Sequence, residues 1–222
     1  MNDRHDNQGL GGRLSAYFSR NWKITALFFA ILALLMAGIL ILSLVLDNRK
    51  SESEILAEDI QDAYIKWLQD SSEKQNSEEL EKLITKALDE YPRYFAAQRA
   101  LFTRGLMALK NEEWEEATSA FESVAERWKN SYLAPVSLYN AGAAKEELGA
   151  IDDAIRYWKR LVENYAGVSP DVPEALFNLG RLAESNDTEE ALKHYYELVA
   201  KFPNSRWTDL SKTRILIIES RL

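Results

Sequence analysis

The chain of 222 residues contains no cysteine. A disulfide framework, a thiolate metal site, a cysteine nucleophile and a lipid-modified N-terminal cysteine are therefore excluded. Histidine is nearly absent, since His5 and His194 are the only two, and neither has a second ligand at metal spacing. We expect both histidines to face solvent or to pack, and we expect neither a metal nor a cofactor.

Catalytic motifs are also missing. The sequence has no glycine-rich phosphate loop, no nucleophile elbow and no dinucleotide fingerprint. Paired carboxylates do occur, but each pair falls where a helix is expected to begin, and there unpaired N–H groups and the helix dipole favour negative charge. The pairs are Glu78 with Glu79, Glu115 with Glu116, Asp152 with Asp153, and Glu189 with Glu190. The sequence predicts a protein that is not an enzyme.

Positive charge is scarce. The chain has 27 Lys and Arg residues against 35 Asp and Glu, a net charge of −8, whereas binding to phosphates needs clustered Lys and Arg. We therefore expect no nucleic-acid partner. Six tryptophans and ten tyrosines could stack on bases, but we expect them to belong to the core, because five of them fall on repeating stripes that predict buried helix faces.

One long apolar run is present. Residues 24–46 carry no charge over 23 positions, and a helix of that length, about 35 Å, can cross a hydrocarbon core of about 30 Å. A cleaved signal peptide would have a shorter apolar stretch, of about 7 to 15 residues, and a small-x-small site. The run predicts an uncleaved signal anchor that places the chain in a lipid bilayer.

The flanks of this run predict its orientation. Four basic residues precede it, namely Arg4, Arg13, Arg20 and Lys23, and only Arg49 and Lys50 follow closely. The positive-inside rule then keeps the N-terminal tail in the cytoplasm, although the moderate bias leaves the opposite orientation open. Within the run, one narrow face of small residues offers a packing surface for another transmembrane helix: Ala26, Ala30, Ala33 and Ala37.

The rest of the chain repeats every 37 residues, as the aromatic residues Tyr91, Trp128, Tyr165 and Phe202 show. Each aromatic closes a stripe at i, i+4, i+7 and i+11, which is one buried helix face. The stripes are Leu80, Ile84, Ala87 and Tyr91; Ala117, Phe121, Val124 and Trp128; Ala154, Trp158, Leu161 and Tyr165; and Ala191, Tyr195, Leu198 and Phe202. Self-similarity at this period predicts a stacked array of helical hairpins.

A glycine precedes each of the last three stripes, at Gly105, Gly142 and Gly180. Glycine costs about 1 kcal/mol relative to alanine inside a helix, so its recurrence indicates a close approach of two helices. We expect each glycine to face the alanine that opens the stripe of its partner helix.

These motifs carry a family resemblance. LFNLG at 176–180 with Ala191, Tyr195 and Pro203, and LYNAG at 138–142 with Ala154 and Trp158, resemble tetratricopeptide repeats. The departures are the period of 37 and a first unit with Leu68 and Leu80 in place of glycine and alanine. WKNSYLAP and FPNSRWTD resemble linkers of tetratricopeptide proteins in bacterial envelopes, and the layout resembles that of the membrane-anchored accessory subunit of the Sec translocon.

The resemblance and the periodicity together predict an all-α chain. We expect a polar tail at 1–23, a transmembrane helix at 24–46, a linker at 47–53 and an α-solenoid of about four hairpins at 54–222. The expected helices lie near 54–71, 77–91, 95–110, 113–128, 134–148, 151–165, 173–185, 188–202 and, as a cap, 206–220. The cap carries the apolar run 215–218, so it is either sandwiched or offers a surface to a homodimer or a partner.

In this family the first helix of each unit lines a concave groove, and the residue three before the glycine points into it. The resemblance therefore implies a ladder of Ile65, Phe102, Tyr139 and Phe177, with the neighbours Arg99, Leu106, Glu146, Glu147, Glu174, Arg181 and Glu184. The acidic C-terminal half would favour a basic or amphipathic protein segment. The ladder side chains could instead seal the packing between units.

The layout predicts a single-pass protein of the bacterial inner membrane whose periplasmic array recruits or holds envelope or secretory proteins. An import receptor whose array faces the cytosol and binds targeting peptides remains the alternative. An enzyme would require titratable groups that converge in a pocket.

Overall fold

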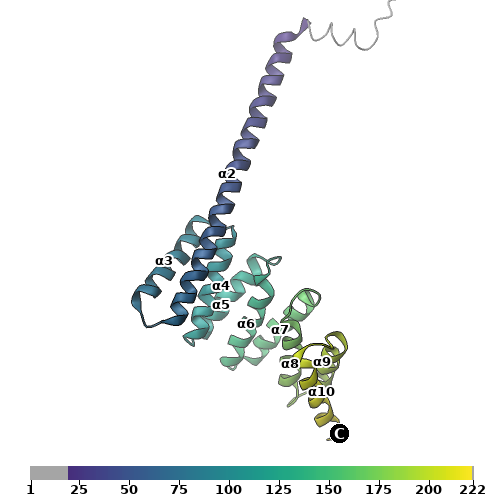
Figure 1. Ribbon diagram of the computed structural model, residues 1–222. Coiled ribbons are helices and arrows are strands. Elements are labelled where there is room, and N and C mark those ends of the chain that lie inside the picture. Colours follow the sequence, from purple (N-terminus) through teal and green to yellow (C-terminus); the bar gives the residue numbers. More distant parts are fainter. Residues whose placement is uncertain (1–19, 222) are drawn as a thin grey trace, which may run out of the picture. The chain divides into compact units, whose positions relative to one another are not determined.

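The computed structural model describes residues 20–221, and every regular element in that range is a helix. This confirms the predicted all-α fold, an apolar N-terminal helix followed by a solenoid of helical hairpins (Figure 1). Two compact units are present, one ending at Glu52 and the other comprising Ser53–Leu222. Each unit is described by itself.

Helix α2, Trp22–Gln69, is a single helix of 48 residues. Among the described residues, its apolar stretch is the one segment that meets the length and composition of a membrane span. Ala26, Ala30, Ala33 and Ala37 are all exposed, and their role as a packing face stays a prediction.

The expected linker 47–53 lies inside helix α2. This segment contains neither glycine nor proline, so nothing in it breaks a helix. The Asn48 amide donates to Glu52 Oε1 at 2.9 Å, one turn along the helix. The expected linker is therefore helical, while the division of the chain into functional domains stays a prediction.

The second unit begins with the C-terminal part of α2, and each of the helices from α4 on packs against the next. The later helices are α3 Lys74–Glu90, α4 Phe95–Lys110, α5 Trp114–Arg127, α6 Leu133–Glu147, α7 Ile151–Tyr165, α8 Val172–Ala183, α9 Thr188–Lys201 and α10 Arg206–Glu219. The first helices of the four hairpins are α2, α4, α6 and α8, and the second helices are α3, α5, α7 and α9.

The predicted stripes form the core of this unit. The first three residues of every stripe are buried. The aromatic that ends each stripe lies at the end of its helix, because Tyr91, Trp128 and Phe202 are C-cap residues and Tyr165 is the last residue of α7. The 37-residue period therefore marks both the buried face and the end of each second helix.

The recurring glycines face aromatic rings, which corrects the expectation that they face alanines. A Cβ placed at Gly105, Gly142 or Gly180 would lie 2.7, 2.4 or 2.6 Å from ring atoms of Phe121, Trp158 and Tyr195, respectively. These rings belong to the second position of each stripe, four residues after the alanine. Glycine is needed because a flat ring lies directly on the backbone of the first helix.

Candidate protein-binding groove

The predicted ladder lies on the face that α2, α4, α6 and α8 share, here called the groove face. Its members differ in exposure, because Ile65 is 44% exposed, Phe102 only 9% exposed, and Tyr139 and Phe177 are half-buried. Most of the ladder is therefore covered by the protein itself.

Each ladder aromatic packs on the ring that covers the glycine of its own unit. The ring centroids of Phe102 and Phe121 are 5.5 Å apart, and those of Phe177 and Tyr195 are 5.7 Å apart. Edge and tilted contacts at such distances are favourable pairings in a core. These contacts place the ladder aromatics in the packing of their own hairpins, and Ile65 is the one exposed member of the ladder. The choice between groove binding and packing between units stays a prediction.

The expected acidic half of the groove face is paired with arginines of the same chain. Arg181 on α8 donates to Glu146 on α6 at 2.7 Å. Helix α10 contributes two further arginines: Arg214 binds Glu184, and Arg206 lies 3.4 Å from Glu174. These contacts join α6 to α8, and α10 to α8 and its C-cap residue Glu184.

Two of these carboxylates are also bound by tyrosines. The Tyr139 hydroxyl donates to Glu174 Oε1 at 2.7 Å, and burial together with this carboxylate raises the pKa of Tyr139. Arg214 lowers the pKa of Glu184, assisted by the hydroxyl of Tyr195. Of the remaining predicted residues, Leu106 is half-buried and Glu147 is exposed.

The N-terminal part of the groove face has a pocket of about 660 Å³. Arg99, a predicted residue, forms part of its wall, and its guanidinium donates to Gln61 Oε1 at 3.0 Å and to the Tyr132 hydroxyl at 2.7 Å. The other lining residues are Glu54, Ala57, Glu58, Asp62 and Phe95.

Sequence reasoning missed most of this pocket, although the repeat contained the signal. Glu58, Phe95 and Tyr132 are spaced by 37, and so are Asp62 and Arg99. These two series lie seven and three residues before the ladder, on the same helix face. The prediction followed the ladder position, whereas the open space lies one or two turns earlier.

Three of the four carboxylate pairs lie in the first turn of a helix, as predicted for α5, α7 and α9. The pair of Glu78 and Glu79 does not, because α3 begins earlier, at Lys74. Among residues 20–221, no group of three or more His, Cys, Asp or Glu side chains could hold a metal ion.

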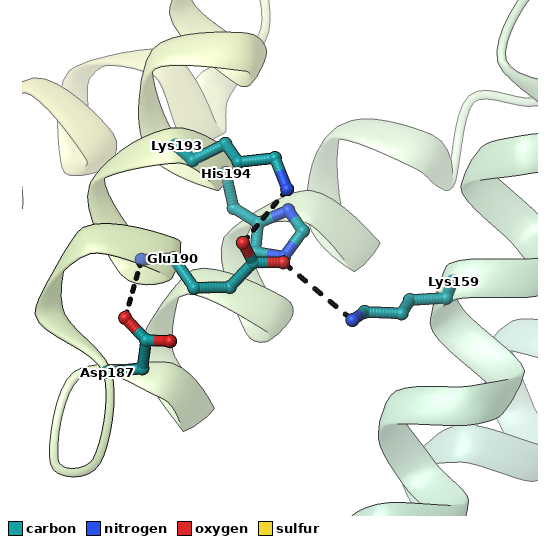
Figure 2. A network of polar contacts seen from close by, with 5 residues as sticks. All are labelled: Lys159, Asp187, Glu190, Lys193 and His194. Carbon is teal, nitrogen blue, oxygen red and sulfur yellow. Dashed lines mark hydrogen bonds and ion pairs between the residues drawn. The ribbon is translucent and has the colours of Figure 1, made fainter.

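His194 belongs to a polar network on α9 (Figure 2). It is buried, and its Nε2 lies 3.2 Å from Glu190 Oε1. The Glu190 carboxylate also contacts Lys193 at 2.9 Å and Lys159, on α7, at 3.7 Å. The backbone N–H of Glu190 donates to the Asp187 side chain. Of the two roles expected for the histidines, His194 therefore has the packing role. His5 lies outside the described residues.

Helical hairpins that repeat in phase and stack on their neighbours define the class of helical-repeat proteins. Within this class, residues 139–206 match the tetratricopeptide repeat family. A TPR repeat-containing protein of Treponema pallidum (strain Nichols) is 34% identical over 110 residues, which cover 48% of this chain and 44% of the relative. The chain thus spans less than half of that relative, and both findings support a tetratricopeptide repeat protein.

Proposed function

We propose that this protein is a membrane-anchored scaffold that recruits or holds envelope or secretory proteins on its groove face. Helix α2 carries the proposal, because the same helix that contains the apolar span also supplies the first helix of the array. Its residues Leu56, Ile60 and Trp67 are buried in the array's own core. Tetratricopeptide repeats generally mediate protein binding, which supports the same function.

The proposed orientation places the tail in the cytoplasm and the array in the periplasm of a bacterial inner membrane. The basic residues before the span support it. As part of the same proposal, the order of tail, membrane span and repeat array is similar to that of the accessory subunit of the Sec translocon. In this arrangement the array meets proteins that enter or cross the envelope.

Site-specific photocrosslinking in cells tests the scaffold. A photoreactive residue at Ile65, on the groove face, should form crosslinks to a discrete set of proteins. A matched probe at Ile151, which is 38% exposed at the start of α7, should not form them. Equal crosslinking from both positions, or none from Ile65, would contradict binding at the groove face.

A further inference from the structure

The N-terminal pocket of the groove face, here called the α2–α4 pocket, is negatively charged. Its lining contains the carboxylates of Glu54, Glu58 and Asp62 and the single guanidinium of Arg99, a net charge of −2. Three other carboxylates of the predicted groove, Glu146, Glu174 and Glu184, are bound to arginines of the chain. Two carboxylates of the pocket, Glu58 and Asp62, are instead exposed.

Arg99 has its own structural partners. Its guanidinium is held by Gln61 and Tyr132 and lies 5.5 Å from the ring centroid of Phe95. In contrast, Glu58 and Asp62 are exposed, and within residues 20–221 their side-chain carboxylates form no hydrogen bond or ion pair. Two carboxylates on one turn of α2 thus remain open to a cationic ligand.

The other wall of the pocket is aromatic. Phe95 and Tyr132 have ring centroids 5.9 Å apart, and Tyr132 is 64% exposed. Rings of this kind bind the aliphatic stem of a long basic side chain, and their faces attract its charged end. An aromatic wall opposite carboxylates fits arginine or lysine better than a purely apolar side chain.

We propose that the α2–α4 pocket binds a basic segment of a partner protein, with an arginine or lysine stem against Phe95 and Tyr132 and its charge between Glu58 and Asp62. This inference rests on the proposed scaffold function and specifies its ligand. It also moves the basic ligand from the C-terminal half of the groove face, where the carboxylates are already paired, to the N-terminal half.

The test uses the full chain in micelles of a neutral detergent. The probe is a fluorescent nonapeptide with two arginines separated by one leucine, followed by fluorescence anisotropy. We expect saturable binding that weakens with salt, and no binding of the same peptide with glutamate in place of arginine. The double variant Glu58→Lys with Asp62→Lys should weaken binding by about tenfold or more.

Asp59→Lys is the matched control, since Asp59 is exposed on the same helix but does not line the pocket. It should change the affinity by less than about twofold, because successive residues of a helix point about 100° apart and Asp59 does not line the pocket, so solvent screens its charge. Three results would overturn the proposed pocket. The wild-type protein could fail to bind the peptide, the double variant could bind it as tightly as wild type, or Asp59→Lys could lose as much affinity as the double variant. Unchanged helicity and melting of the double variant would show that it is folded.

The outcome also separates this inference from the scaffold function. If the peptide fails to bind while the Ile65 crosslinks persist, the basic ligand is wrong and the scaffold stands. If the protein with the probe at Ile65 also forms no crosslinks, the scaffold function itself is wrong. If the peptide binds and the crosslinks form, both proposals are supported.

Discussion

The pairing of glycine with an aromatic ring shows how single residues set the hairpin geometry. Trp158 is fully buried against Gly142 and donates its Nε1 hydrogen to the Tyr139 carbonyl at 3.1 Å. The first unit has Leu68 at the glycine position and Ile84 at the aromatic position. Compared with the later units, the first unit therefore has a larger residue on its first helix and a narrower residue at the facing position of its second helix.

Gly142→Ala should therefore destabilise the protein even though alanine is the better helix former. The new methyl group would overlap the indole of Trp158, which is buried and hydrogen-bonded and so cannot move aside. Overpacking of this kind costs about 1–3 kcal/mol, against a helix-propensity gain of about 1 kcal/mol. Urea unfolding should show a net loss in the free energy of unfolding.

Gly167→Ala serves as its control, because a Cβ there would meet no atom within 4 Å. That variant should unfold close to wild type. A Gly142→Ala protein as stable as wild type would mean that the indole can shift, and the proposed reason for the glycine would be wrong.

The buried imidazole of His194 makes a pH prediction. Burial lowers the pKa of His194, and the nearby Glu190 carboxylate offsets this only in part. Between the lowered pKa of folded His194 and its ordinary pKa, the unfolded chain binds more protons than the folded chain. The free energy of unfolding therefore rises with pH in that range. The His194 contribution is complete above the ordinary pKa of about 6.5 and is lost as the pH falls through it toward the folded value.

Substitution by glutamine tests this sign, since its amide is similar in size and does not titrate. The melting temperature of His194→Gln should fall less than that of wild type between about pH 7.5 and pH 5.5. Carboxylates titrate mostly below this pH range and therefore contribute little to the comparison. A steeper fall in the variant would show that Glu190 outweighs burial and raises the pKa of His194.

At the scale of the helices, the groove face is tied together by contacts between first helices of successive units. Gln61 with Arg99 joins α2 to α4, and Arg99 with Tyr132, the N-cap residue of α6, joins α4 to α6. Tyr139 with Glu174 and Glu146 with Arg181 join α6 to α8. Each pair spans about one repeat in sequence, so the contacts fix the stacking between units. The polar residues of this face stabilise the array as well as lining it.

The ladder now divides into a packing part and an open part, which a matched pair of variants should separate. Phe102→Ala removes a ring that is 9% exposed and packed on Phe121, so it should lower the free energy of unfolding by about 3–5 kcal/mol. Ile65→Ala removes a side chain that is 44% exposed and should change it by about 0.5 kcal/mol.

Thermal melting followed by circular dichroism measures both. Similar small effects would return Phe102 to the binding surface, whereas similar large effects would place Ile65 in the core. The Ile65→Ala protein should also keep its helicity.

The sequence predicts the elements well, because burial with a period of 3.6 within a helix and 37 between units leaves a local signal. The stripe Ala154, Trp158 and Leu161 is an example, since all three are buried as expected. The ion pairs of the groove face were not predictable in this way. Whether Glu146 meets Arg181 depends on the rotation of one unit against the next, which no single helix specifies.

At the scale of the whole molecule, the charge distribution and the anchor helix bear on topology. Four basic residues precede the apolar run and two follow it closely, and the chain as a whole carries a net charge of −8. Translocating an acidic array while a basic tail stays behind agrees with the positive-inside rule. The α2–α4 pocket would then be presented on the side of the membrane opposite to the tail.

The absence of cysteine gives a direct test of this topology, because any single cysteine introduced is the only thiol in the chain. In intact bacterial cells with a permeabilised outer membrane, Asn130→Cys, at an exposed position, should react with a membrane-impermeant maleimide. Ser15→Cys in the tail should react only after the inner membrane is opened. The reverse pattern would place the array in the cytosol and favour the import-receptor alternative, and labelling of both in intact cells would contradict a membrane-spanning anchor.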